Sequence, residues 1–171
     1  MTSALPEALL TVGATCGELL RERGETVATG EGSCGGLISV ALLAVPGARG
    51  VNNHMGSRAT ENEATMIAFM AVVQKRGFFF IDSVTSRQSV AYDIAQRAGI
   101  RSARNIMFLD HIEDTESVVK RLYALAERAR VEGTVIGIGH AKENTLKALQ
   151  MVLPELQKEG FEFVLAEDAV R

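Results

Sequence analysis

The sequence predicts an α/β fold in which helices alternate with the strands of a mostly parallel sheet. Five times along the chain, a helix-like segment ends in polar or charged residues and a glycine, and a short apolar run follows; these glycines are Gly24, Gly77, Gly99, Gly133 and Gly160. Glycine suits the left-handed turn just past a helix, and a repeated helix, glycine and strand indicates parallel βα units. The middle apolar runs are almost uninterrupted, which is typical of strands covered by helices on both faces.

Six strands are expected, and we expect them to form an open or half-closed sheet or an incomplete (β/α) barrel. The predicted strands are 26–29, 49–53, 78–82, 106–110, 134–139 and 161–166. The predicted helices are 5–23, 36–44, 61–76, 89–98, 114–131 and 143–159. Thr60 and Glu63 fit a capping box at the start of the third helix. Met66, Met70 and Val73 form an apolar stripe on that helix, so we interpret them as core residues.

Length and composition are those of one globular domain over residues 1–171. The chain is 47% apolar and 23% charged, and a chain of this length buries about 70% of its unfolded surface. The net charge is -3, and no run of Lys or Arg exceeds two residues. A nucleic-acid backbone requires a concentrated basic face, so we expect no nucleic-acid partner.

The sequence also bears on location and assembly. The first residues lack the basic stretch of a signal peptide, and no window has the length of a membrane span. We therefore expect a cytoplasmic protein with no membrane partner. An open sheet would leave edge strands, which makes a homodimer a plausible assembly.

Polar side chains gather where the predicted strands end. All three histidines, His54, His111 and His140, follow strands, as do Asp82 and Asp110. Ligands of parallel α/β sheets bind at the carboxyl ends of the strands. The concentration of histidines and carboxylates there favours a functional rim.

Metal-assisted hydrolysis is the chemistry that such a rim could support. Two imidazoles and one or two carboxylates hold Zn²⁺ while leaving a position open for water, and a further carboxylate can act as general base. The candidates are His54, Asp82, Asp110 and His140. An Asp that follows a strand also commonly caps the next helix, so a purely structural role stays open.

A glycine-rich loop after the first strand is a candidate anion-binding loop. It contains Gly32, Ser33, Cys34, Gly35 and Gly36. Backbone N–H groups at such a helix start can cradle an anion, although the loop matches neither a dinucleotide-binding fingerprint nor a P-loop. Ser33 or Cys34 could be a nucleophile if a base lay nearby. A plain flexible connection is the alternative interpretation.

Four motifs follow one another in the second part of the chain: VPGARGVNNHMGSRAT at 45–60, FFFIDSVTS at 78–86, FLD at 108–110 and IGIGH at 136–140. This part resembles the divergent polysaccharide deacetylase family, which is related to NodB-type carbohydrate esterases. The resemblance implies a NodB-like (β/α) barrel, often incomplete, with a divalent metal near the strand ends. It implies metal-site positions at His54 and His140, with Asp82 and Asp110 on the same rim.

Two departures from that family bear on activity. The family opens with a strand that ends in an Asp-Asp pair, which supplies a metal ligand and the catalytic base, and this chain contains no Asp-Asp. The family also tends to read Gly-His-Pro-His where this chain has Gly139-His140-Ala141-Lys142. Lys142 thus replaces an imidazole, which should weaken a metal site. Glu31 is the candidate substitute carboxylate.

The first 47 residues resemble a different family. The sequence LLRERGETVATGEGSCGGLISVALLAVPG is similar to the start of the CinA C-terminal domain, the nicotinamide mononucleotide deamidase family. That family reads Glu-Ser-Cys-Thr-Gly-Gly where this chain has Glu31 and the glycine-rich loop after it. The two resemblances, over 5–47 and 45–171, meet at Val45-Pro46-Gly47, so the chain would divide into a CinA-like part at 1–47 and a deacetylase-like part at 48–171. The simplest account of both is a chimera, engineered or recombined.

Three functional hypotheses follow. The first is a chimeric or designed protein with a vestigial deacetylase-like site and no evolved activity. The second is a metal-dependent hydrolase of acetylated carbohydrate that recruits Glu31, and it predicts stoichiometric Zn²⁺. The third is a nicotinamide nucleotide amidohydrolase that uses Ser33 or Cys34. The fold alone does not decide among them.

Overall fold

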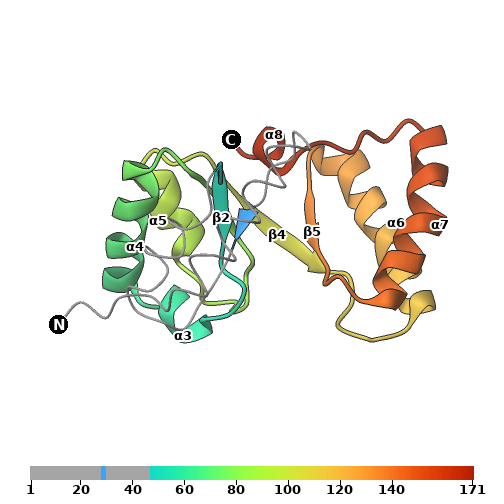
Figure 1. Cartoon of the computed structure of the whole chain (residues 1–171), viewed down its shortest axis with the longest axis horizontal. Helices are drawn as coiled ribbons and strands as arrows, with labels where there is room; N and C mark the ends of the chain where they lie inside the picture. Colours follow the sequence, from blue (N-terminus) through green and yellow to red (C-terminus); the bar gives the residue numbers. More distant parts are fainter. Residues whose placement is uncertain (1–27, 30–46) are drawn as a thin grey trace. The chain divides into compact units, whose positions relative to one another are not determined.

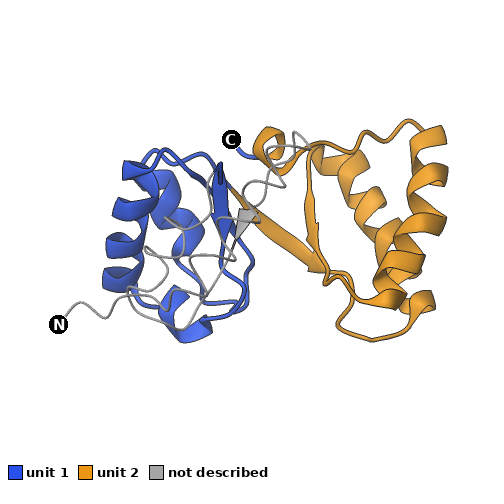
Figure 2. Cartoon of the chain, in the orientation of Figure 1, with its two compact units in different colours: residues 1–102, 170–171 blue, residues 103–169 orange. Residues whose placement is uncertain are grey.

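The computed structural model describes residues 28–29 and 47–171 of the chain (Figure 1). The described part is an α/β fold with parallel strands, as predicted. It divides into two compact units (Figure 2). Unit 1 is residues 1–102 with 170–171, and unit 2 is residues 103–169. The predicted helices 5–23 and 36–44 lie outside the described residues.

The described residues of unit 1 contain three parallel strands in chain order. They are β1 (Ala28–Thr29), β2 (Gly50–Asn52) and β3 (Phe79–Asp82). Thr29 pairs with Val51, and Val51 pairs with Phe80. The backbone N–H of Phe80 donates to the carbonyl of Arg101 at 3.0 Å, just before the next strand begins. The second and third predicted strands are thus confirmed, and the first is confirmed at the two residues that the structure describes.

The helices that the structure describes in unit 1 are α3 (Ser57–Thr60), α4 (Glu63–Lys75) and α5 (Ala91–Arg97). The predicted capping box at Thr60 is wrong. Thr60 ends the unpredicted helix α3, and its hydroxyl donates to the carbonyl of Ser57 at 2.9 Å. Asn62 caps α4 instead, because its Oδ1 accepts from the N–H of Thr65 at 2.8 Å. The competing use of the Thr60 hydroxyl moves the helix start by two residues.

The core of unit 1 forms between the strands and α4 and α5. Val51, Met70, Val73 and Phe80 are almost completely buried. The rings of Phe69 and Phe80 meet edge to face, with centroids 6.0 Å apart. The apolar stripe predicted on α4 is therefore core, as expected.

Gly50 occupies a position that only glycine fits. It pairs with Phe79 in the sheet register, and a Cβ on Gly50 would lie 2.3 Å from the Phe79 ring. We expect Gly50→Ala to destabilise the protein by about 1–3 kcal/mol through overpacking, measured by urea denaturation. The same substitution in a Phe79→Leu background should cost much less. Equal costs in the two backgrounds would contradict the steric explanation.

Unit 2 is built on two parallel strands. β4 (Ser102–Phe108) starts at the end of unit 1, and β5 (Ile136–Ile138) pairs with it from Asn105 onward. The register shifts between Asn105 and Met107, where Asn105 Oδ1 accepts from the N–H of Met107 at 3.1 Å. The predicted strand 106–110 therefore had the wrong bounds. The first four residues of β4, 102–105, are mostly polar and therefore gave no apolar run from which a strand could be predicted.

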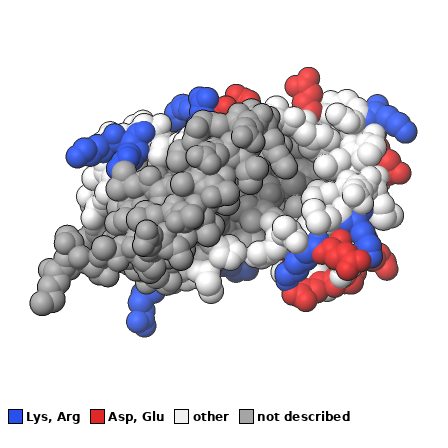
Figure 3. Space-filling view, in the orientation of Figure 1, with Lys and Arg blue, Asp and Glu red and all other residues white. Residues whose placement is uncertain are grey.

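The two longer helices of unit 2 pack against each other and confirm the two predicted helices. They are α6 (Thr115–Glu132) and α7 (Glu143–Lys158). Their shared core contains Leu109, Val118, Leu122, Ala148, Val152 and Leu156. No helix in the described ranges combines the length and apolar character needed to cross a membrane. Outside the grey area of Figure 3, both Lys or Arg and Asp or Glu side chains are visible, and they lie side by side at the lower right.

The predicted sixth strand at 161–166 is wrong. Residues 161–165 have no regular structure, and the short helix α8 (Ala166–Ala169) follows. Phe163, Val164 and Leu165 are at least half exposed. An apolar run becomes a strand only where a neighbouring strand accepts its backbone, and sequence alone does not show that neighbour. The described residues therefore form five strands, and closure into a barrel stays a prediction.

The last residues return to unit 1. Val170 is buried, and the backbones of Ser102 and Arg171 exchange two hydrogen bonds, at 2.9 and 3.3 Å. The Gln96 amide donates both to the Ser102 hydroxyl, at 2.8 Å, and to the Arg171 carbonyl, at 3.3 Å. The chain thus leaves unit 1 after Ser102 and re-enters it beside the same residue.

Candidate functional site: polar clusters at the strand ends

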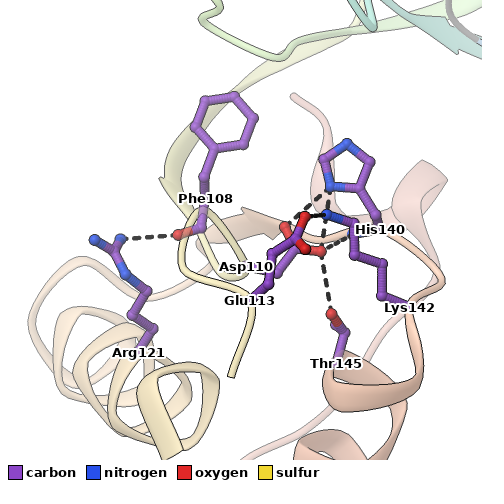
Figure 4. A network of polar contacts seen from close by, with 7 residues as sticks. All are labelled: Phe108, Asp110, Glu113, Arg121, His140, Lys142 and Thr145. Carbon is purple, nitrogen blue, oxygen red and sulfur yellow. Dashed lines mark hydrogen bonds and ion pairs between the residues drawn. The ribbon is translucent and has the colours of Figure 1, made fainter. Parts of the chain in front are cut away.

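Asp110 and His140 form a pair in unit 2, just past the ends of β4 and β5 (Figure 4). The side chain of Asp110 is only 2% exposed, whereas that of His140 is 45% exposed. Asp110 Oδ2 accepts from the backbone N–H of His140 at 2.6 Å and from the Thr145 hydroxyl at 3.1 Å. Asp110 Oδ1 lies 3.0 Å from His140 Nδ1. The buried carboxylate therefore holds both the backbone and the ring of the histidine.

The surroundings of Asp110 determine its charge. Burial raises the pKa of Asp110, but hydrogen bonds from His140 and Thr145 and the charge of His140 outweigh it, so this pKa lies below its ordinary value. An ionised carboxylate only accepts hydrogen bonds, so His140 Nδ1 must carry a proton. In the neutral ring Nε2 then bears the lone pair. This is the nitrogen that a general base or a metal ligand uses.

The loops after β4 and β5 are joined by further polar contacts. Lys142 Nζ forms an ion pair with Glu113, which raises the pKa of Lys142. Asn144 Nδ2 donates to the Glu113 carbonyl at 2.8 Å, and the Thr115 hydroxyl donates to Asn144 Oδ1 at 3.2 Å. Lys142, which stands where the family has an imidazole, thus has a structural partner. These contacts fix the loops that carry Asp110 and His140.

Arg121 of α6 supports the end of β4. One guanidinium nitrogen donates to the Phe108 carbonyl at 2.8 Å, and the other lies 3.0 Å from His111 Nε2. Because a guanidinium only donates, His111 Nε2 acts as the acceptor. No sequence pattern pointed to Arg121 or Thr145, which come from helices and reach the site only through the tertiary fold.

Asp82, in unit 1, organises the loop between β3 and α5. Its side chain is fully buried. Oδ1 accepts from the N–H of Val84 at 2.8 Å, and Oδ2 accepts from the Ser89 hydroxyl at 2.8 Å and the N–H of Tyr92 at 3.3 Å. Tyr92 lies in the first turn of α5, so these contacts fit the helix-capping role considered for an Asp after a strand.

Two asparagines from the end of β2 reach the same loop. Asn53 Oδ1 accepts from the N–H of Ser83 at 2.8 Å, and Asn52 Nδ2 donates to the Ser83 hydroxyl at 2.9 Å. His54, the next residue, is exposed. Asn52, Asn53 and Ser83 thus form a polar cluster at the carboxyl ends of β2 and β3.

The predicted site residues divide between the units. His54 and Asp82 lie in unit 1, and Asp110 and His140 lie in unit 2, where they meet. The convergence of all four on one mouth stays a prediction. The remaining predicted site residues lie outside the described part of the chain; they are Glu31, Gly32, Ser33, Cys34, Gly35 and Gly36.

The predicted Zn²⁺ site stays a prediction, because the described residues of neither unit form a metal site by themselves. Within residues 28–29 and 47–171, no group of three or more His, Cys, Asp or Glu side chains has the arrangement of a metal site. Unit 2 supplies two donors, Asp110 and His140, and Asp110 already accepts bonds on both oxygens. Both oxygens of Asp82 are also occupied, and a structural or catalytic zinc site uses three or four protein ligands.

A comparison of sequences supports the resemblance that the four motifs carry. The pattern of the family described as "Divergent polysaccharide deacetylase" matches residues 34–170. The chain belongs to this family. An uncharacterized protein of Haemophilus influenzae is 38% identical over 122 residues, which are 71% of this chain and 44% of that protein. The uncharacterized protein YibQ of Escherichia coli is 32% identical over 120 residues, 70% of this chain and 38% of YibQ.

The chain spans less than half the length of those two relatives. A solved structure shares its fold: the crystal structure of the uncharacterized protein ATU2773 from Agrobacterium tumefaciens C58 superposes with a TM-score of 0.75 at 22% identity, covering 84% of this chain and 68% of that one. The family match begins at residue 34 and runs across Val45-Pro46-Gly47. The comparisons therefore support the deacetylase resemblance and give no support to a CinA-derived segment or a chimera.

Proposed function

We propose that this member of the family removes an acetyl group from a carbohydrate, with His140 as general base and general acid. The Asp110–His140 pair carries the proposal. A buried, ionised carboxylate on Nδ1 leaves the Nε2 lone pair as the basic nitrogen of a half-exposed ring. Family membership supplies the substrate class, because it associates the chain with carbohydrate deacetylation.

The reaction uses the two ring nitrogens in different roles. His140 Nε2 takes a proton from water as the water oxygen bonds to the acetyl carbonyl carbon. When the bond from that carbon to the sugar oxygen or nitrogen breaks, Nε2 returns the proton to the leaving atom. The products are acetate and a sugar hydroxyl or amine. Asp110 keeps the ring in the required tautomer and stabilises the imidazolium that forms between the two steps.

Metal dependence is a separate prediction of the family resemblance. The described residues of neither unit group three metal-binding side chains, so the mechanism above is written for the side chains of Asp110 and His140 alone. Acetate release should be measured both with a chelator and with added Zn²⁺. A requirement for Zn²⁺ would mean that residues beyond Asp110 and His140 complete the reactive centre.

His140→Gln should lower the rate of acetate release from an N-acetylated or O-acetylated oligosaccharide by about 10²–10⁴-fold, the usual contribution of a general acid–base group. His111→Gln is the matched control, because His111 lies on the same rim but contacts Arg121 instead of Asp110. We expect that control to keep most of the activity.

Two results would overturn the proposal. One is a His140→Gln variant with the activity of the unmodified protein. The other is an unmodified protein that releases no acetate with or without Zn²⁺, which would favour the hypothesis of a vestigial site without catalytic activity.

A further inference from the structure

An unpartnered, buried donor marks the carboxyl ends of β2 and β3 in unit 1. Asn53 is 5% exposed, and its Oδ1 accepts from the N–H of Ser83 at 2.8 Å. This contact fixes the amide orientation, because a flipped amide would place two donors face to face. Asn53 Nδ2 is therefore a donor, and it finds no acceptor within the described part of the chain. Buried donors of this kind are rare and costly in folded proteins.

Thr85 repeats this feature nearby in the loop after β3. Its Oγ1 is buried and makes no hydrogen bond to any residue that the structure describes. The Thr85 backbone is nevertheless held, since its carbonyl accepts from the Ser57 hydroxyl at 3.1 Å. One unsatisfied polar atom, Thr85 Oγ1, thus lies in the loop after β3, and the other, Asn53 Nδ2, lies at the end of β2.

The backbone of the loop is strained at Val84, the residue before Thr85. Val84 has φ 51°, in the left-handed region. A β-branched residue rarely adopts this conformation, and it persists only where the surroundings impose it. Here Asp82 Oδ1 imposes it by accepting from the Val84 N–H at 2.8 Å. Strain and unsatisfied polar atoms at one place weaken the fold, and such combinations are typical of functional sites.

We propose that Asn53 and Thr85 form a carbohydrate-binding subsite in unit 1, which the loop Ser83–Thr85 opens on binding. Asn53 Nδ2 would donate to a ligand oxygen that accepts, such as a hydroxyl or an acetamido carbonyl. The Thr85 hydroxyl would exchange a hydrogen bond with a sugar hydroxyl. Rotation of Val84 out of the left-handed region would release strain during the same movement.

The chemistry of the cluster favours a neutral sugar. The groups at the strand ends are amides and hydroxyls, from Asn52, Asn53, Ser83 and Thr85. The buried carboxylate beside them, Asp82, has both oxygens occupied by protein donors. The choice of an acetylated carbohydrate as ligand rests on the proposed function, whereas the subsite itself rests on the geometry of unit 1.

Thr85→Val separates binding from a structural role, because it replaces the hydroxyl by a methyl group of nearly the same shape. We expect the free variant to melt at a higher temperature, since an unsatisfied buried hydroxyl is removed. We expect its dissociation constant for the N-acetylglucosamine tetramer to rise about tenfold, as for the loss of one hydrogen bond. Binding is measured by calorimetry in a His140→Gln background, so that no turnover occurs.

Asn53→Asp gives a second, independent measurement. The new carboxylate keeps an acceptor for the Ser83 N–H but lacks the donor that we assign to the ligand. Its affinity for the tetramer should fall by a similar factor. Thr134→Val is the matched control, since Thr134 is exposed in unit 2, and it should change neither melting temperature nor affinity.

Opposite changes in stability and affinity support the subsite. A Thr85→Val variant that melts lower and binds the tetramer normally would overturn it, as would an unmodified protein that does not bind the tetramer. The two proposals fail separately. Tetramer binding without acetate release contradicts the proposed function alone, whereas acetate release with an unchanged KM in both variants contradicts the subsite alone.

Discussion

Replacing Asp110 with Asn is expected to reduce acetate release by about 10³–10⁴-fold, the effect of losing the carboxylate of a carboxylate–histidine pair. An amide at this position would present its NH₂ group to His140 or Thr145, where the structure has only donors. His140 would then favour the tautomer with its proton on Nε2. In that tautomer Nε2 has no lone pair and cannot accept a proton from water. Steady-state kinetics on an acetylated oligosaccharide measure the loss.

The same variant should show a stability effect that depends on pH. Asp110 makes charged hydrogen bonds while nearly buried, so its replacement should cost about 2–3 kcal/mol at neutral pH. The pKa of Asp110 is lowered in the folded protein, so the unfolded chain takes up this proton at a higher pH than the folded one. The contribution is therefore complete above the ordinary pKa of about 3.9 and is lost as pH falls through the folded value. The difference between the two proteins should shrink in acid.

Asp114→Asn is the control for this experiment. Asp114 lies four residues further on and caps α6, where its Oδ1 accepts from the N–H of Ser117 at 2.7 Å. Asn caps helices about as well as Asp, so this variant should keep its activity and stability. Wild-type turnover in Asp110→Asn, or equal losses in both variants, would contradict the role given to the buried pair.

Phe80→Ala is expected to destabilise the protein by about 3–5 kcal/mol, the range for removing a buried aromatic side chain. Phe80 is completely buried on β3, and Phe69 meets it edge to face. The described core residues of the two units are different, so the cavity should destabilise unit 1 more than unit 2. Hydrogen exchange should show a loss of protection at β2 and β3 that exceeds the loss at α6 and α7.

A phenylalanine on the surface provides the control. Phe163 is 50% exposed in the unstructured segment before α8, so Phe163→Ala should change the denaturation midpoint only slightly. A similar loss of protection in both units after Phe80→Ala would show that they unfold as one cooperative body.

Local sequence patterns predicted most of the framework. The glycines after the helices and the apolar runs located β2, β3, α6 and α7 within a few residues. We expected the polar residues at the strand ends to lie close together, and Asp110 and His140 do so. The reason is that the parallel strands β4 and β5 end at the same edge. In these cases the local sequence pattern was compatible with only one kind of element, and the structure contains that element.

Sequence-based prediction failed where the local sequence is compatible with more than one structure. Thr60 and Asn62 are both good caps, and only the unpredicted α3 decides between them. Residues 161–165 have strand-like composition but no partner strand among the described residues. Thr145 and the unsatisfied amide of Asn53 depend on contacts between distant segments, which no short pattern encodes.

The pairing of Ser102 with Arg171 has a thermodynamic consequence. All of residues 103–169 form a loop whose two ends are pinned at neighbouring positions. When unit 2 is folded, its own structure limits the distance between those ends. When unit 2 unfolds, the Ser102–Arg171 pair must hold together the ends of a long random coil. The loss of chain entropy on closing that loop lowers the free energy of unfolding of unit 1. The stabilities of the two units are therefore coupled through chain entropy, and this coupling requires no side-chain contact.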